Sequence, residues 1–391
     1  METSIKRRKC TEEKGNIATS EFDKLTADLI TSIFVRCPVK TLSTLRCVSK
    51  SWNDLIISPP FYSHHLKQSM ENAPQLLVMD RYLLGATKCR LRFVSVGTEV
   101  EEGESNELYN DIFPPLFWCS WLVCYGLVCI SAGDRRIFLC NPAMQQVCQL
   151  PKCSRTALPL RSEHFGFGYL HSKNEYKVVH FLYGRPASRR SRYPGLAQLR
   201  CEVFTINGVG GISNSRWKEI AEMPPYHPYL TGLLVNECMY WLAGVRLGAK
   251  PNRIFSFDFE NEKFLTISQP SSFKTLSNLK MLDLKGMLCL VDKDHFHKSS
   301  ILDLWILKDK ISCIWVKEYS INLVNFRSEK IMSTFGTCNE EIIFTLQDEV
   351  VFYDLKRNCF RRVRRVPRFD FGLQIYDFGI YRETLFSLGS T

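Results

Sequence analysis

A strand followed by a polar turn recurs five times in the chain, and this repeat limits the fold more than any other feature. The five segments are IFLCNP (137–142), CEVFTING (201–208), IFSFDFEN (254–261), LDLWILKD (302–309) and VVFYDLKR (350–357). From Asn141 through Asp258 to Asp354 the units average roughly 50 residues, a period typical of propeller blades. Each unit also holds an earlier apolar strand, such as 125–130 or 341–346. The repeat therefore predicts an all-β propeller-like domain.

The two ends of the repeating region are expected to meet. Residues 75–96 have the composition of strands that begin an additional blade, and the aromatic stretch 370–388 is placed to pair with them. Such a pairing closes the ring of blades and removes exposed sheet edges. We therefore expect a closed ring of about six blades of the kelch type.

Residues 22–66 carry a helical pattern instead. Pro38 and the polar run 49–51 divide this stretch into three segments. Apolar side chains recur in them at helical spacing, namely Leu29, Ile30, Ile33 and Phe34, then Leu42, Leu45 and Val48, then Trp52, Leu55 and Ile56. A unit of about 40 residues has too much surface for its volume to bury all of these groups. It therefore needs the rest of the chain or a partner.

The helical stretch also matches a known pattern residue by residue. The matches are Leu25, Asp28, Leu29, Ile33, Arg36, Pro38, Val39, Lys40, Leu42, the contiguous RCVSKSW (46–52), Leu55, Ile56, Pro59, Phe61, His65 and Leu66. With these residues the stretch resembles the F-box of plant F-box proteins. The departures are Thr26 in place of Pro, Cys37 in place of Leu and Leu45 in place of Phe. Thr26 can still cap the first helix through its hydroxyl group.

The second half resembles the F-box-associated domain of the same proteins over roughly residues 118–360. The matching phrases are YGLVCI, IFLCNP, FGFGYLHSKNEYKVVHFLY, SRWKEI, LLVNECMYWLAG, IFSFDFENEKF and the stretch 305–321. The family has Asn-Gly at two turns where this chain has Tyr125-Gly126 and Asn236-Glu237. Those substitutions bear on the turn type, since Asn-Gly favours positive φ.

Together these observations predict an α+β multidomain chain. We expect a basic disordered tail at 1–20, a small three-helix F-box at 21–67 and an all-β propeller-like domain at 68–391.

The resemblance implies a substrate-recognition subunit of an SCF-type ubiquitin ligase. The F-box would bind a Skp-type adaptor, which links to a cullin scaffold, and the β domain would hold a target protein for ubiquitination and degradation. The residues expected to contact the adaptor are Leu25, Leu29, Ile30, Ile33, Pro38, Val39 and Leu42. Trp52 and Ile56 are expected to hold the helices together. Such a receptor holds the target protein in place for ubiquitination and makes or breaks no bonds itself, so no enzyme activity is expected.

Two basic segments indicate the target-binding region. Residues 185–200 and 356–368 are rich in arginine, and the whole chain carries a net charge of +11. Arginine suits bidentate recognition of carboxylates and phosphates, so these segments read either as solvated surface charge or as a binding site for an acidic protein partner. The candidate residues are Arg189, Arg190, Arg192, Arg361, Arg362, Arg364 and Arg365. Nucleic acid is disfavoured because neither segment has a nucleic-acid-reading motif or an interleaved aromatic platform.

Motifs for catalysis, metals and cofactors are missing from the sequence. None of the eight histidines lies in an H-E-x-x-H frame, and neither a G-x-S-x-G elbow nor a P-loop occurs. The sixteen cysteines form no C-x-x-C pair and read as free thiols. We expect neither a cofactor nor a metal. Two alternatives remain open, a propeller enzyme resembling kelch-type oxidases with a helical cap, and an F-box protein that acts outside the ligase.

Cellular location is constrained by what the sequence lacks. It has no apolar run of 18 residues, so no membrane partner is expected, and the first 21 residues have no apolar core of a secretory signal. We therefore expect the protein in the cytoplasm, the nucleus or both. The basic run 6–9 reads either as part of a solvated tail or as a nuclear signal. The acidic stretch 99–111 reads as a flexible loop.

Overall fold

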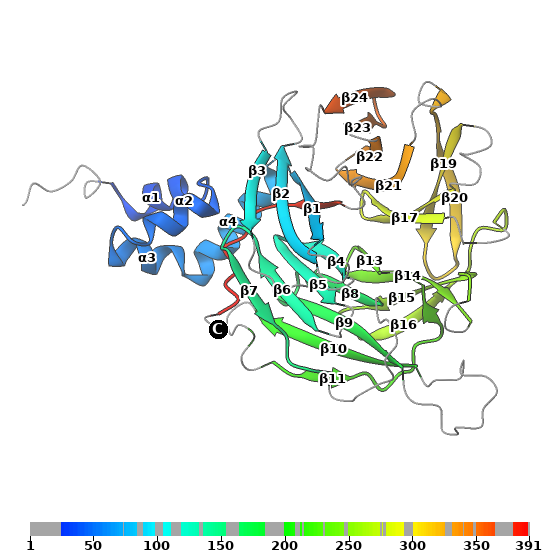
Figure 1. The fold of residues 1–391 in the computed structure, drawn as a ribbon, viewed down its shortest axis with the longest axis horizontal. Helices are drawn as coiled ribbons and strands as arrows, with labels where there is room; N and C mark the ends of the chain where they lie inside the picture. The colour runs from blue at the N-terminus through cyan, green and yellow to red at the C-terminus, as the bar shows by residue number, and fades with distance from the viewer. Residues whose placement is uncertain are drawn as a thin grey trace, which may run out of the picture.

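The structure is a computed structural model of the 391-residue chain. It describes residues 25–72, 74–83, 89–97, 105–110, 119–132, 136–153, 164–183, 199–207, 212, 215–229, 231–245, 249–273, 276, 279–292, 300–324, 331–338, 340–346, 349–363 and 378–389. Helices occupy the first part and strands the remainder (Figure 1).

The helical unit contains four helices, one more than the three expected. They are α1 (Ala27–Phe34), α2 (Val39–Leu45), α3 (Lys50–Ile56) and α4 (Pro59–Glu71). The side chains of Thr26, Ser49 and Ser58 accept hydrogen bonds from the first turns of α1, α3 and α4. Ser58 and the following prolines start α4, because proline suits the first turn of a helix. The expected boundary between residues 67 and 68 falls inside α4.

A small apolar core holds the helices together. It consists of Phe34, Val35, Leu42, Ile56 and Phe61. Trp52 packs on its edge, with its ring 5.0 Å from that of Phe34 in a T-shaped arrangement. The prediction that Trp52 and Ile56 join the helices is confirmed.

The described strands form six sheets, which we call blades I to VI. Within each blade the strands are given from the innermost strand outward. Blade I is β25 (Phe378–Tyr381), β1 (Gln75–Leu83), β2 (Cys89–Gly97) and β3 (Ser105–Asn110). Blade II is β4 (Cys119–Cys124), β5 (Leu127–Ala132), β6 (Ile137–Asn141) and β7 (Gln146–Gln149). Blade III is β8 (Phe165–Leu170), β9 (Glu175–Tyr183), β10 (Leu199–Asn207) and β11 (Trp217–Glu219).

The remaining blades follow the same plan. Blade IV begins with two short strands, β12 (His227–Pro228) and β13 (Leu233–Val235), followed by β14 (Cys238–Gly244), β15 (Arg253–Asp258) and β16 (Lys263–Ile267). Blade V is β17 (Leu279–Leu284), β18 (Met287–Asp292), β19 (Ile301–Asp309) and β20 (Ile314–Asn322). Blade VI is β21 (Ile331–Cys338), β22 (Glu341–Leu346), β23 (Glu349–Asp354) and β24 (Cys359–Val363).

The recurring turn signal has a common physical basis. The side chains of Asn141, Asp258, Asp309 and Asp354 each accept hydrogen bonds from backbone N–H groups two or three residues later. Each turn then has a residue with positive φ just before the next strand, namely Gln145, Glu262, Cys313 and Asn358. A short polar side chain at the third strand's end thus fixes the hairpin to the fourth strand.

The ring closes as predicted. Strand β25 pairs with β1 in antiparallel fashion, from Gln75 opposite Tyr381 to Val78 opposite Phe378. The innermost strands contact one another in the order β25, β4, β8, β13, β17, β21 and back to β25. The last strand of the chain therefore completes the first blade from inside (Figure 1).

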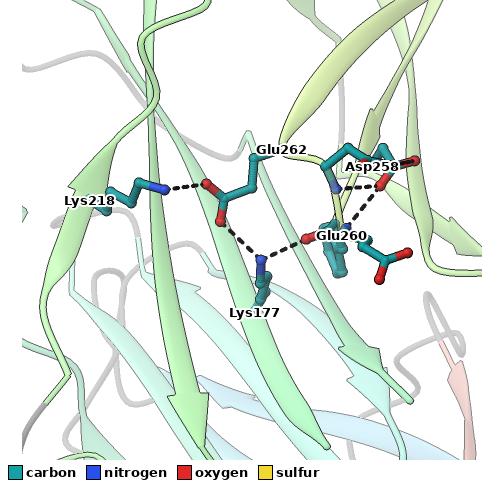
Figure 2. Close-up of polar contacts among 7 residues, drawn as sticks. Lys177, Lys218, Asp258, Glu260 and Glu262 are labelled. Carbon is teal, nitrogen blue, oxygen red and sulfur yellow. Dashed lines mark hydrogen bonds and ion pairs between the residues drawn. The ribbon is translucent and has the colours of Figure 1, made fainter. Parts of the chain in front are cut away.

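Blades III and IV are joined by a buried polar contact (Figure 2). Lys177 of β9 donates from Nζ to the carbonyl of Phe259 at 2.6 Å and to Glu262 Oε1 at 2.9 Å. Lys218 of β11 reaches the other carboxylate oxygen at 2.6 Å. Burial acts to raise the pKa of Glu262, but the hydrogen bonds from Lys218 and Lys177 outweigh it and hold the pKa below its usual value.

Among the helices of the described ranges, none combines the length and the apolar content that a lipid bilayer crossing needs.

Candidate docking surfaces and central channel

The outer face of α1 exposes apolar side chains. Leu29 is 53% exposed and Ile33, one turn later, is 50% exposed. Leu25 and Ile30 are partly buried beside them, and Pro38 is exposed. Apolar side chains at positions i and i+4 lie next to each other on a helix, so they form one patch. This is a surface that a protein partner can cover.

Two of the residues expected on this surface lie elsewhere. Val39 and Leu42 are both 0% exposed. Leu42 packs among Phe34, Val35, Ile56 and Phe61 inside the helical core. Neither side chain is exposed for contact with a partner, so their burial does not support the prediction that they bind an adaptor. The candidate set is reduced to Leu25, Leu29, Ile30, Ile33 and Pro38.

Two exposed apolar residues were missed. Val48, after α2, and Ile57, after α3, are each more than half exposed. Helical spacing groups Val48 with Leu42 and Leu45, because the three residues recur at every third position. The helix ends at Leu45, however, so that periodicity does not extend to it.

The C-terminal segment 382–389 joins the helices to the propeller; we call it the tail. The backbone N–H of Val39 donates to Glu383 Oε2 at 2.8 Å, and the Ser69 hydroxyl donates to the Glu383 carbonyl at 3.0 Å. Pro38 provides no side-chain cap for α2. Glu383 therefore supplies the missing acceptor, and its negative charge suits a helix N-terminus. No sequence pattern indicates this contact, because the two residues are 344 positions apart.

The tail is equally tied to blade II. The Asn141 side-chain amide donates to the carbonyls of Thr384 at 2.9 Å and Phe386 at 2.8 Å. Phe386 and Leu388 are buried in the core that also contains Leu66 of α4. Helices and propeller are thus connected through one buried segment, not only through a linker.

The helices and the ends of strands β9 and β24 belong to opposite faces of the ring. The hairpins that follow the innermost strands gather at one face: the Tyr125 and His171 rings are 4.7 Å apart, and His171 Nδ1 lies 3.0 Å from Glu237 Oε1. Arg382, where β25 ends, approaches Gly126 at this same face. Because strands alternate in direction, β9 and β24 end at the other face. Segments 184–198 and 364–377 continue from those ends.

The hairpins at this first face keep the expected geometry despite their unusual residues. Tyr125 and Gly126 both have positive φ, as do Asn236 and Glu237. The substitutions for Asn-Gly therefore leave the turn type unchanged.

Of the candidate arginines, Arg361 is the one whose side chain the structure describes. Its Nη2 lies 2.8 Å from Glu341 Oε2, and its guanidinium stacks 4.4 Å from the Phe352 ring. It stabilises blade VI. Arg362 lies on β24, opposite Val351. The side chain of Arg362 and the residues Arg189, Arg190, Arg192, Arg364 and Arg365 lie outside the described part of the chain.

A cavity of about 560 Å³ occupies the central channel. Its walls come from β4, β13, β17, β21 and β25, and Met70 of α4 borders it. Burial raises the pKa of Asp283 on this wall, although the Gly286 N–H donates to its carboxylate. Burial also raises the pKa of Tyr125 to about 12 and lowers that of Arg382. The channel thus contains polar groups away from bulk water.

Within the ranges that the structure describes, no three His, Cys, Asp or Glu residues gather as metal ligands. The pair His295 and His297 lies outside those ranges. Cysteines such as Cys129 and Cys140 are buried, and burial raises their pKa, so they pack as neutral thiols.

Comparison with known proteins divides the chain at the same place as the fold. Residues 22–64 match the model of the F-box domain, and residues 89–370 match that of the F-box associated beta propeller domain. The Arabidopsis thaliana F-box protein At3g07870 is 24% identical over 336 residues, covering 82% of this chain and 78% of that protein. The putative F-box protein At4g38870 of the same plant is 28% identical over 370 residues, covering 86% and 81%.

Two further similarities were found. The Arabidopsis thaliana F-box/kelch-repeat protein At4g19930 is 24% identical over 372 residues, covering 86% of this chain and 84% of that protein. A solved structure titled "Structure of YjhT" covers 74% of this chain and 97% of its own at a TM-score of 0.44 and 10% identity, too distant to support a conclusion.

Proposed function

This chain belongs to the family of F-box proteins with an F-box associated β-propeller, and from that premise we propose that it is a substrate-recognition subunit of an SCF-type ubiquitin ligase. Its helices bind a Skp-type adaptor, which links to a cullin scaffold. Its propeller binds a target protein for ubiquitination and degradation. With these partners, the protein acts in the cytoplasm or the nucleus.

The observation that carries the proposal is the half-exposed pair Leu29 and Ile33 on α1. Exposed apolar side chains on a small helical unit are costly in water unless a partner covers them. The pair also lies within the segment that matches the F-box model. Leu25, Ile30 and Pro38 border it and complete the proposed adaptor surface.

The receptor needs no catalytic groups of its own. Its effect is to hold a target near the ubiquitin thioester carried by another subunit, which raises the effective concentration of a target lysine. The tail supports this role, because a receptor whose two parts are fixed to each other holds the target at a defined distance from the adaptor.

The adaptor interaction is tested by replacing both exposed residues with alanine. Interface side chains of this kind typically cost about 2 kcal/mol or more when truncated, so Leu29→Ala with Ile33→Ala reduces adaptor affinity by at least roughly thirtyfold. A purified plant Skp-type adaptor and calorimetry give the affinity.

A matched control truncates two apolar residues of similar exposure far from the helices. Ile311 and Ile314 of blade V are 73% and 51% exposed, and Ile311→Ala with Ile314→Ala leaves adaptor affinity unchanged. Leu42→Ala is a poor test of contact, since it removes core packing. Equal affinity of the wild type and the Leu29/Ile33 variant, with both folded, would contradict the proposal.

For the target we propose the face opposite the helices. The segments that contain Arg189, Arg190 and Arg192, and Arg364 and Arg365, continue from strand ends at that face. Proximity labelling with the Leu29/Ile33 variant, which holds targets without delivering them, identifies candidates. Arg362→Ser with Arg364→Ser and Arg365→Ser then weakens target capture and its salt dependence. Arg361 is left intact because of its pairing with Glu341. An identical salt slope in both proteins would place recognition elsewhere.

A further inference from the structure

The wall of the central channel carries an excess of positive charge. Lys280, Lys285 and Arg382 line the cavity, and Asp283 is its one described acidic lining residue. Asp283 accepts a hydrogen bond from the Gly286 N–H at 2.9 Å, within its own turn. Lys285 pairs with Glu340 at 3.3 Å, outside the cavity lining.

Arg382 has no such partner. No described carboxylate pairs with its guanidinium, and its Nε is buried without a hydrogen-bond acceptor among the described residues. An uncompensated charge in a buried position destabilises a protein unless an anion neutralises it. The position therefore favours an anionic ligand.

Two neighbouring groups of Arg382 do not provide that anion. Tyr125 and Cys338 are the side chains that interact with it electrostatically. Burial raises the pKa of Tyr125 to about 12 and that of Cys338 to about 11, so both are neutral near pH 7. Among the residues that the structure describes, the positive charge of Arg382 consequently has no carboxylate counter-charge.

We propose that the central channel binds a small oxyanion, carboxylate or phosphate in type, with Arg382 as its main ligand and Lys280 as a second positive charge on the wall. A guanidinium binds either anion through two parallel hydrogen bonds. The volume of about 560 Å³ lies within the usual range for small-ligand pockets. The anion is a free small molecule or an acidic side chain of a bound protein. This inference does not depend on adaptor binding.

Anion binding at Arg382 is also expected to affect the helices. Arg382 directly precedes Glu383, which caps α2, and Met70 of α4 borders the cavity. An anion that holds Arg382 in place therefore slows hydrogen exchange in α2 as well as in β25.

The test measures binding of three probes to the full-length chain at constant ionic strength set with sodium chloride. The probes are inorganic phosphate, citrate and a hexaglutamate peptide, with a hexaglutamine peptide as the neutral control. Saturable binding of phosphate or citrate identifies a free anion as the ligand. Binding of hexaglutamate alone identifies an acidic protein segment. Hexaglutamine does not bind in either case.

Arg382→Gln lowers the affinity of the bound probe at least tenfold. The matched control Lys263→Gln removes an equal charge from an exposed position of β16 and leaves the affinity unchanged. Without probe, Arg382→Gln melts at or above the wild-type temperature, because it removes a partly buried charge that no described carboxylate pairs with. If Arg382 had only a structural role, its replacement would lower the melting temperature.

Lys280→Glu provides a second variant that leaves Arg382 in place. It reverses a half-buried charge on β17 and also weakens probe binding at least tenfold. The proposal is overturned if no probe binds the wild type saturably. It is also overturned if Arg382→Gln binds as the wild type does, or if Arg382→Gln fails to fold and Lys280→Glu binds normally.

Discussion

The helical unit and the propeller achieve their stability in different ways. The helices share a core of five buried apolar side chains, all of which lie between residues 34 and 61. The propeller buries whole strands, such as β5 and β14, against neighbouring blades. Local contacts can be recognised in the sequence as a contiguous motif, whereas the contacts between blades are indicated only by a repeated strand-and-turn pattern.

The difference also concerns independence. A core of five side chains in about 45 residues gives little surplus over the entropy lost on folding. The helices depend on Glu383 and on the cluster that contains Leu66 and Phe386. The propeller is closed by its own strand β25. The tail contacts both regions, so changes in the tail and between blades test the comparison.

The largest effect is expected from ending the chain at Arg368. This removes β25 and the tail, which opens blade I at its inner edge and uncovers the apolar surface under Phe386 and Leu388. Open apolar edges lead to aggregation. We expect no cooperative melting transition and loss of monomeric protein, measured by circular dichroism and size-exclusion chromatography.

A chain ending at Leu388 is the matched control. It lacks three residues, keeps every described buried side chain of the tail and melts as the full chain does. If the chain ending at Arg368 remains monomeric with cooperative melting, the propeller folds without the inner strand of blade I, and the difference between the two regions is smaller than we infer.

A smaller effect is expected between blades III and IV. Glu262→Gln leaves the buried ammonium group of Lys177 without its counter-charge. Because the Glu262 side chain is 20% exposed, we expect a loss of about 2 kcal/mol in the free energy of unfolding, less than for a fully buried pair. Glu219→Gln removes a partner from the exposed pair with Arg200 and costs about 0.5 kcal/mol or less. Equal losses would contradict a special role for the buried pair.

The same pair determines a pH dependence. The pKa of Glu262 is lower in the folded protein than its ordinary value of 4.5. Its contribution to stability is therefore complete above about pH 5 and is lost as the pH falls through the folded pKa. Denaturant melts between pH 7 and pH 3 should show a smaller acid-induced loss for Glu262→Gln than for the wild type.

The smallest effect concerns the link between the two regions. Glu383→Ala removes the acceptor that caps α2, which costs about 1 kcal/mol and speeds hydrogen exchange in α2 roughly fivefold. Glu383→Gln keeps an oxygen acceptor and has about half that effect. Mass spectrometry of exchanged peptides gives both values. Unchanged hydrogen exchange in both variants would mean that contacts among the helices stabilise α2 without any help from Glu383.

Much of the fold followed from local chemistry. Thr26 caps α1 by accepting from the Leu29 N–H, as its hydroxyl group suggested. Ring closure between the two ends of the β region followed from the need to protect sheet edges. Burial of Leu42 could not be predicted, because it depends on packing against Phe61 of α4 and near Leu385 of the tail. The unpaired charge of Arg382 likewise appears only when five innermost strands are assembled.

The tail has a consequence for biosynthesis. Val39 leaves the ribosome 344 residues before the Glu383 that caps its helix. At the usual rates of synthesis of about 5–20 residues per second, that interval lasts roughly 20 to 70 seconds. The first helices of the nascent chain must wait this long with apolar surface uncovered, which is a period when chaperones bind. A chain cut short by a premature stop codon never completes the junction. Only a chain that includes the tail can form these contacts between its helices and its propeller.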